Sequence, residues 1–223
     1  MFRFRTLFLV LLVALLAACS SLSGLGGKTT AESEETQGVI VNGVPSLTLN
    51  HFAGEVTIRD GEAGKITANL TRRSRLTDEA AAQAQLDLIT MTFTQNGTNV
   101  TLSIEGPDEF AEMVNAPSAD LELLVPPGTA LNIDQGAGDL TVERPTGDVE
   151  VNLGAGNATV TLPDDAAFHL IVSGGVATVK SEFEGVPEGG VAANIDVNVG
   201  GNSPTQTLTF NVGAGDVNLN KAP

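Results

Sequence analysis

The sequence contains no tryptophan, no tyrosine and a single cysteine, Cys19. One cysteine cannot form a disulfide within the chain, so the fold cannot depend on a disulfide framework. Sugar-binding proteins commonly stack their ligands on Trp or Tyr rings, and this chain has neither. Only 11 Lys and Arg accompany 27 Asp and Glu, which gives a formal net charge of −16. A chain this acidic repels nucleic acid, so we expect no nucleic-acid partner and interpret the charge as favouring solubility.

The sequence also has no apolar run of the roughly 20 residues that span a bilayer. Its longest apolar run, at residues 7–16 near the N-terminus, is shorter than this. It follows Arg3 and Arg5 and is followed by small residues, which is typical of an export signal. The sequence therefore predicts an exported protein.

The apolar run ends in Leu-Ala-Ala-Cys at residues 16–19, which resembles the bacterial lipobox. The resemblance implies a lipoprotein signal peptide at 1–18, cleavage before Cys19, and acylation of the Cys19 sulfur and its new amino group. Ser20 resembles an outer-membrane address in a diderm bacterium; in a monoderm the protein would stay on the outer face of the cell membrane. An ordinary signal peptide cut nearby, or an uncleaved anchor, is the alternative.

Residues 20–37 are rich in Ser, Gly, Thr and Glu and show no apolar periodicity. This composition is typical of a flexible tether. We therefore expect a lipidated cysteine and tether at 19–37 and a single folded domain at 38–221.

Glycine, in contrast, is abundant, with 25 residues. One phrase recurs: a glycine turn followed by a strand of alternating apolar and polar residues, which indicates one buried face. When the copies are aligned on their last glycine, the spacings between successive copies are 84, 18, 19 and 40 residues. Further degenerate copies are therefore expected within the spacings of 84 and 40 residues. The aligned turn glycines are Gly54, Gly138, Gly156, Gly175 and Gly215.

Two strands in each repeat of 18 to 20 residues predict an all-β domain, a β-solenoid of flattened coils stacked about 4.8 Å apart. A β-sandwich also gives short alternating strands and is the alternative. One short helix is expected at Thr77–Gln85, with Thr77 as its cap, and one helical turn at 109–113. Asn96-Gly97 predicts a hairpin.

Residues 121–162, with the turns PPGT, GAGD, TGD and GAGN, look like the bacterial putative adhesin family of β-strand-repeat proteins. The resemblance covers residues 38–220. It implies a β-solenoid-like fold and a cell-envelope setting, often in lipoprotein form. The family supplies no catalytic residues that could be assigned to this chain.

Enzymes need convergent groups at fixed spacing, and no nucleophile, metalloprotease or phosphate-binding motif is present. His51 and His169 stand far apart. We therefore expect no enzyme and no cofactor, although a carbohydrate-active β-helix enzyme is kept as an alternative. The acids occupy turns, where such side chains bond their own backbone: Asp134, Asp139, Asp148, Asp164, Asp165, Asp196 and Asp216.

Two polar sets each allow a functional and a structural interpretation. Asp139, Asn157 and Asp216 recur at one repeat position and could align oxygens for calcium, but backbone hydrogen bonding is favoured because the spacing of calcium-binding repeats is missing. The basic run at 72–75, with Arg72, Arg73 and Arg75, is either an anion-binding patch or a strand end that balances acidic neighbours, and the second is favoured.

Together these observations predict a non-enzymatic, lipid-anchored cell-envelope protein that presents a β-repeat domain for adhesion or protein contact. Its expected partners are the membrane, through the N-terminal lipid, and an envelope or surface protein. An envelope structural or stress-sensing component is the alternative function.

Overall fold

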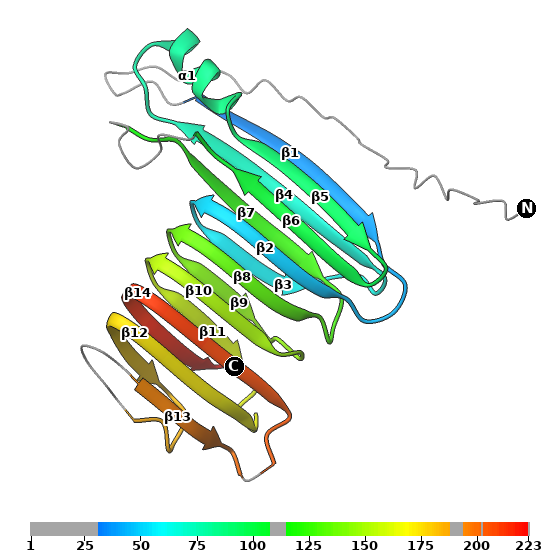
Figure 1. Cartoon of the computed structure of the whole chain (residues 1–223), viewed down its shortest axis with the longest axis vertical. Helices are drawn as coiled ribbons and strands as arrows, with labels where there is room; N and C mark the ends of the chain where they lie inside the picture. Colours follow the sequence, from blue (N-terminus) through cyan, green and yellow to red (C-terminus); the bar gives the residue numbers. More distant parts are fainter. Residues whose placement is uncertain (1–30, 108–114, 188–193, 202, 223) are drawn as a thin grey trace, which may run out of the picture.

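A computed structural model of the protein describes residues 31–107, 115–187, 194–201 and 203–222 (Figure 1). Within these ranges the chain forms strands β1 to β14 and the short helix α1. Their bounds are β1 (Ala31–Ile40), β2 (Ser46–Ala53), β3 (Val56–Asp60), β4 (Lys65–Ser74), α1 (Glu79–Leu86), β5 (Thr90–Asn96), β6 (Asn99–Glu105), β7 (Ser118–Val125), β8 (Ala130–Ala137), β9 (Leu140–Glu143), β10 (Val149–Ala155), β11 (Ala158–Leu162), β12 (Phe168–Ser181), β13 (Asn194–Val199) and β14 (Gln206–Lys221). The all-β class predicted from the sequence is confirmed.

The strands form one sheet that folds back on itself into two layers. Its order is β1-β4-β7-β3-β9-β11-β14-β10-β8-β2-β6-β5, with β12 paired to β14 and β13 paired to β12. The long strand β14 belongs to both layers, because it pairs with β10 before its Gly-Ala-Gly corner and with β11 after it. The buried apolar side chains lie between the layers, and Phe168 and Phe210 are the largest fully buried ones.

Parallel strands of successive coils pair in register across each layer. Ala53 of β2 pairs with Ala137 of β8, and Ala155 of β10 pairs with both Ala137 and Ala214. After the corner, Val56 pairs with Leu140 in the same way. Each coil therefore crosses one layer, turns at a glycine corner, and returns along the other.

The order of the coils in space differs from their order in the chain. β14 lies between the coil of β10 and β11 on one side and β12 on the other, so the last strand is an inner strand, and β12 with its partner β13 lies outside it (Figure 1). Of the degenerate coils expected in the two long gaps, one is present between Gly54 and Gly138, because β6 pairs in parallel with β2 and β7 pairs in parallel with β3. The other strands of the two gaps, β4, β5 and β13, are antiparallel to their neighbours.

Residues 31–37, expected to belong to the tether, instead form the first part of β1, so the strand structure includes residues before Gly38. β1 pairs antiparallel with β4 along its whole length. Local patterning does not reveal this strand, because its inward-facing positions are mostly polar. Among its ten residues only Val39 is buried.

The predicted helix and hairpin are present. Helix α1 begins at Glu79, and its cap is Asp78, whose side chain accepts a hydrogen bond from the Ala81 N–H; Thr77, the expected cap, lies one residue too early. Strands β5 and β6 form the hairpin at Asn96-Gly97, where Gly97 has a φ of 65°. The helical turn expected at 109–113 lies outside the described residues.

Candidate functional site

The glycine corners hold the backbones of successive coils in close contact. The register places Gly54, Gly138, Gly156 and Gly215 in one row along the stack. Each has a positive φ between 114° and 148°. A Cβ on Gly156 would lie closer than 3.0 Å to the carbonyl oxygen of Gly138, a separation that real side chains do not adopt. These corners therefore need glycine for both its backbone freedom and its size.

Gly175, which the sequence aligns with this row, lies in a neighbouring one. β12 pairs with β14 so that Ala177 lies beside Gly215 and Gly174 beside Val212. The register thus places Gly175 beside Gly213, the first glycine of its phrase. A shift of two residues keeps the same side chains inward, so the alternation in the sequence could not reveal it.

A polar row follows each corner glycine. The Asn157 N–H and side-chain amide both donate to Asp139 Oδ1, at 2.9 and 3.0 Å, and the Asp216 N–H donates to Asn157 Oδ1 at 3.1 Å. The Glu55 N–H donates to Asp120 in the same manner at 3.0 Å. These oxygens satisfy backbone donors of the next coil, as favoured from the sequence. In the described residues no group of three or more His, Cys, Asp or Glu is arranged to hold a metal ion.

Lys180 closes this row at Asp216, with Nζ 2.6 Å from Oδ2. The hydrogen bond from Lys180 lowers the pKa of the Asp216 carboxyl below its usual range. At the end of β14, the Asp164 carboxylate accepts from Lys221 Nζ at 2.5 Å and raises the pKa of that ammonium. Both pairs are exposed, so they fix side-chain positions and contribute little stability.

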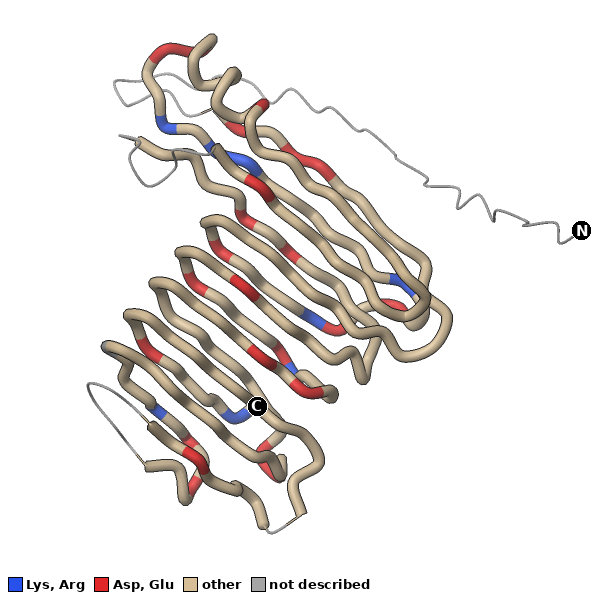
Figure 2. Tube along the Cα trace, in the orientation of Figure 1, with Lys and Arg blue, Asp and Glu red and all other residues tan. Residues whose placement is uncertain are grey.

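One layer presents ion pairs to solvent. We call the outward side chains of β1, β4, β7, β3, β9, β11 and the later halves of β14 and β12 the ion-paired face. Arg59 bridges Glu122 and Glu143, at 2.9 and 3.1 Å. Asn69 continues the row by bonding Glu122 at 3.1 Å and accepting from Thr36 Oγ1 at 2.9 Å. Along the Cα trace of the whole molecule, Asp and Glu positions are more frequent than Lys and Arg positions (Figure 2).

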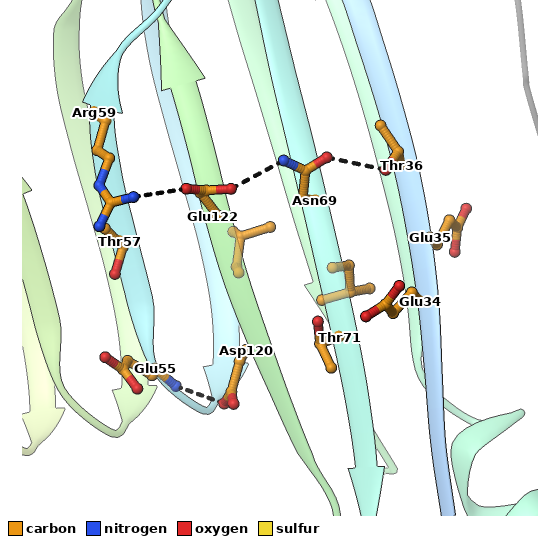
Figure 3. A pocket seen from close by; sticks show the side chains of 12 residues that line it. Glu34, Glu35, Thr36, Glu55, Thr57, Arg59, Asn69, Thr71, Asp120 and Glu122 are labelled. Atoms are coloured by element: carbon orange, nitrogen blue, oxygen red, sulfur yellow. Dashed lines mark hydrogen bonds and ion pairs between the residues drawn. The ribbon is translucent and has the colours of Figure 1, made fainter. Parts of the chain in front are cut away.

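The ion-paired face has a shallow depression of about 400 Å³ between β1, β4, β7 and β3 (Figure 3). Carboxylates dominate its lining, with Arg59 as the one cation among the lining residues. Its hydrogen bonds join neighbouring strands to one another, and no nucleophile is paired with a base among these lining residues. The carboxylates that line it are Glu34, Glu35, Glu55, Asp120 and Glu122.

The basic run at 72–75 divides between two environments. Arg72 contacts Glu35 and donates from Nε to the Ile89 carbonyl at 3.0 Å. Arg73 contacts Glu32 at 3.0 Å and also Asp120. Two of the three arginines therefore pair with acids of neighbouring strands, which agrees with the favoured interpretation, while Arg75 is exposed.

The opposite layer has a different chemistry. We call the outward side chains of β5, β6, β2, β8, β10, the first halves of β14 and β12, and β13 the amide–hydroxyl face. Its described strands carry no Lys or Arg. One row of it runs from Asn50 through Asp134 and Asn152 to Asn211, with Asn152 donating to Asp134 at 2.8 Å. Beside this row the glycines of β8, β10 and β14 leave a shallow groove of about 450 Å³.

Sequence reasoning missed this row as a surface feature. Four of the five phrases contain one Asn or Asp just before the glycine turn, and the fifth has Ser173; that recurrence is the signal that could have shown the row. Its alignment into one continuous row depends on which coils are neighbours, and the position of β14 decides that.

The two histidines lie apart and serve different roles. His51 is buried between the layers, and its Nε2 lies 2.7 Å from the Ala119 carbonyl oxygen. Burial lowers the pKa of the His51 imidazole to about 4. His169 is on the amide–hydroxyl face, with Nε2 2.7 Å from Asp196 Oδ1. Within the described chain neither imidazole hydrogen-bonds a serine, threonine or cysteine, so no nucleophile–base pair is assembled around them.

Cys19, the predicted lipidation site, lies outside the described residues, so its acylation stays a prediction. Among the residues that the structure describes, no helix is both long and apolar enough to cross a bilayer.

Two solved structures of bacterial proteins resemble this fold to different degrees. A putative cell adhesion protein from Clostridium sporogenes matches with a TM-score of 0.56 and 17% identity, over 86% of this chain and 100% of that one. A putative adhesin from Bacteroides fragilis matches over 83% of this chain and 96% of that one, at 11% identity. Its TM-score of 0.25 is too low to show a shared fold. No family model and no curated protein matches the sequence.

The likeness to the Clostridium sporogenes protein extends over all of that chain, so the whole two-layer domain, and not a fragment of it, shares the fold. At 17% identity the likeness concerns the fold alone.

Proposed function

We propose that this protein is a non-enzymatic, lipid-anchored component of the bacterial cell envelope that presents a rigid β-repeat domain for adhesion or protein contact. The observation that carries the proposal is the stack itself. Its coils display polar side chains in continuous rows on two broad faces, whereas its clefts are shallow. Such a scaffold suits contact with another large surface better than enclosure of a small substrate. The shared fold with a protein named for cell adhesion is consistent with this role.

The domain is a β-solenoid in this proposal. Three coils and β14 pair in parallel and in register on both sides of the corners, as stacked coils of a solenoid do and as antiparallel Greek-key sandwiches do not. At the N-terminal end the antiparallel pairs β1–β4 and β5–β6 extend the two layers beyond the coils, and β1 and β5 are the edge strands.

The amide–hydroxyl face is the proposed contact surface. Its described strands lack the long cations whose flexible side chains make a surface costly to desolvate, and its Asn, Thr and Ser side chains can both donate and accept. Asn211, on the first half of β14, is exposed and lies between Asn152 of β10 and Ser173 of β12 on this face.

The adhesion role is tested by binding of the soluble domain to intact bacterial and host cells in parallel. Asn211→Lys places a cation on the amide–hydroxyl face, and Asn218→Lys, from the same strand, places one on the ion-paired face as a matched control. We expect wild type and the control to bind and Asn211→Lys to lose at least severalfold in affinity. Binding of all three at the level of an unrelated acidic protein would reject adhesion by this domain.

The lipid anchor is tested by the intact mass of the protein extracted from membranes, compared with Cys19→Ser. A chain that begins at Cys19 and carries acyl mass, with an unmodified variant, supports the anchor. Protease treatment of intact cells then separates a surface-exposed adhesin, which is removed, from a periplasmic structural or stress-sensing component, which is spared.

A further inference from the structure

We propose that the edge of β4 is a docking site for an extended acidic strand, that residues 31–37 of the same chain occupy it reversibly, and that residues 31–37 of a second copy are its external ligand. The proposal concerns strand exchange between two copies. It does not depend on acylation of Cys19, so it stands or falls independently of the lipid anchor.

The first observation is that residues 31–37 are held with little apolar burial. None of them is buried, and the alternate positions that face the interior are Ala31, Ser33, Glu35 and Gln37. Burial of apolar area, which is the main force that holds most strands, is therefore small for this segment. What holds it is the backbone ladder to β4 and a few polar side chains.

The second observation is that the contacts are specific for acidic side chains. Arg73 of β4 contacts Glu32, and Arg72 contacts Glu35, so two arginines on adjacent positions bind two glutamates spaced three residues apart. The Arg72 and Glu35 side chains are only 12% and 25% exposed, so this pair is shielded from solvent. A docking strand of other composition would leave the Arg72 guanidinium without its carboxylate.

The third observation is that β1 is an edge strand in the described part of the chain. It lies at one end of the sheet order and β5 at the other, and β1 pairs with β4 alone. Side chains bridge the seam to β5: Gln37 Nε2 donates to the Met91 carbonyl at 3.3 Å, and Gln95 Nε2 donates to the Ile40 carbonyl at 3.0 Å. Among the described strands no backbone ladder crosses this seam, so release of β1 breaks one ladder and not two.

A pivot lies where the polar segment ends. Gly38 separates residues 31–37 from Val39 and Val41, which are 4% and 2% exposed and keep the following chain in place. Glycine in a strand interior weakens pairing and permits a change of direction. Ile40 and Val44, two of the three exposed large apolar side chains in the described residues, lie just after this pivot, where a second copy would cover them.

These features fit exchange between copies because the ligand that satisfies Arg72 and Arg73 is already a segment of every copy. An exchanged strand forms the same ladder and the same ion pairs in the partner, so exchange costs little beyond the association itself. A membrane-confined population would raise the local concentration of such partners.

The experiment uses cysteine cross-linking in the chain from residue 19 onward with Cys19→Ser, so that every introduced thiol is unique. Thr36 and Asn69 contact each other across β1 and β4, with Oγ1 to Oδ1 at 2.9 Å. A Thr36→Cys protein is mixed with an Asn69→Cys protein under mild oxidation. The control mixture pairs Thr36→Cys with Asn218→Cys, a position on the same face far along the stack.

We expect several times more disulfide-linked heterodimer in the first mixture than in the control, rising with protein concentration. A synthetic peptide of residues 31–37 should compete, and the same peptide with Glu32→Gln and Glu35→Gln should not. Equal cross-linking in the two mixtures would overturn the proposal. Hydrogen exchange of the unmodified chain gives a second readout: amides of residues 32–37 should exchange much faster than those of β8, and equal protection would also overturn it.

Discussion

At the residue scale, the corner glycines are constrained in two separate ways, and substitutions can tell these apart. Gly156 has a φ of +138° and the backbone of Gly138 against it, whereas Gly185 has a φ of +87° with nothing within 4 Å. The first position is constrained by torsion and by space, and the second by torsion alone.

We predict that Gly156→Ala lowers the free energy of unfolding by roughly 2–6 kcal/mol, the sum of backbone strain and overpacking. Gly185→Ala, the matched control, should cost about 1–2 kcal/mol, since only the left-handed torsion is disfavoured. Urea denaturation followed by circular dichroism measures both. Equal losses for the two variants would mean that close stacking of the coils does not constrain Gly156.

His51 makes stability depend on pH. Its pKa is lowered to about 4 in the folded protein, whereas an exposed histidine titrates near 6.5. Between these values the unfolded chain binds the extra proton, so the free energy of unfolding falls as the pH drops from about 6.5 toward 4. Above 6.5 both states are neutral and the effect vanishes.

We predict that His51 accounts for about 3 kcal/mol of lost stability between pH 7 and pH 4. His51→Leu is the matched variant, because the register puts Leu153 at the equivalent inward position two coils along. The carboxylates titrate in both proteins, so the difference between the two urea-denaturation profiles isolates the imidazole. Parallel profiles across this pH range would contradict a buried, neutral His51.

At the element scale, helix α1 shows how far local sequence signals extend. The alanine run and the acidic start predict a helix here, and it forms. Its first residue depends on which side chain reaches back to the free N–H groups, and Asp78 does so at 2.8 Å to the Ala81 nitrogen. Thr77 and Asp78 are both good caps in isolation, so propensity alone could not choose between them.

We predict that Asp78→Ala costs about 1 kcal/mol of stability, the usual loss for an N-cap, while Thr77→Ala stays within about 0.5 kcal/mol. Thermal unfolding of both variants checks this. A larger loss of stability for Thr77→Ala than for Asp78→Ala would indicate that Thr77 is the cap and that the helix begins one residue earlier.

Other elements could not be predicted from local patterns. β1 has the composition of a tether, and it becomes a strand because Arg72 and Arg73 of β4 lie where its glutamates can reach them. The register of β12 against β14 is shifted by two residues from the alignment of the sequence phrases. Such a shift leaves the same side chains facing inward, so only the pairing with β14 determines the row in which Gly175 lies. The hairpin at Asn96-Gly97, in contrast, is specified by the turn residues themselves.

At the scale of the whole molecule, the position of β14 is the feature that the sequence could not show. Repeats recognised by their phrase suggest a stack in chain order, but chain order does not determine which coils are neighbours. β12 instead pairs with β14 along 168–181, and β14 pairs with β10 and β11 on its other side. β14, the last strand, thus connects β12 and β13, at the end of the stack, to the coil of β10 and β11.

This arrangement makes a prediction about truncation. In a stack that followed chain order, removal of the last strand would leave the earlier coils intact and would remove only the stability of one terminal interface. Here the chain without residues 206–223 loses five side chains that are 0% exposed: Leu208, Phe210, Val212, Val217 and Leu219. It also leaves the inner edges of β10, β11 and β12 unpaired.

We therefore expect the chain that ends at residue 205 to aggregate or unfold cooperatively and to lose its protease-resistant domain as a whole, because open edges promote association and the exposed core cannot close. A chain that ends at residue 220 is the control and should keep a single unfolding transition near that of the wild type. Size-exclusion chromatography and limited proteolysis followed by mass spectrometry distinguish the outcomes. If the truncated chain instead retained a monomeric, protease-resistant core that includes β12, then β12 would pair directly with β10 or β11, and β14 would be an outer strand after all.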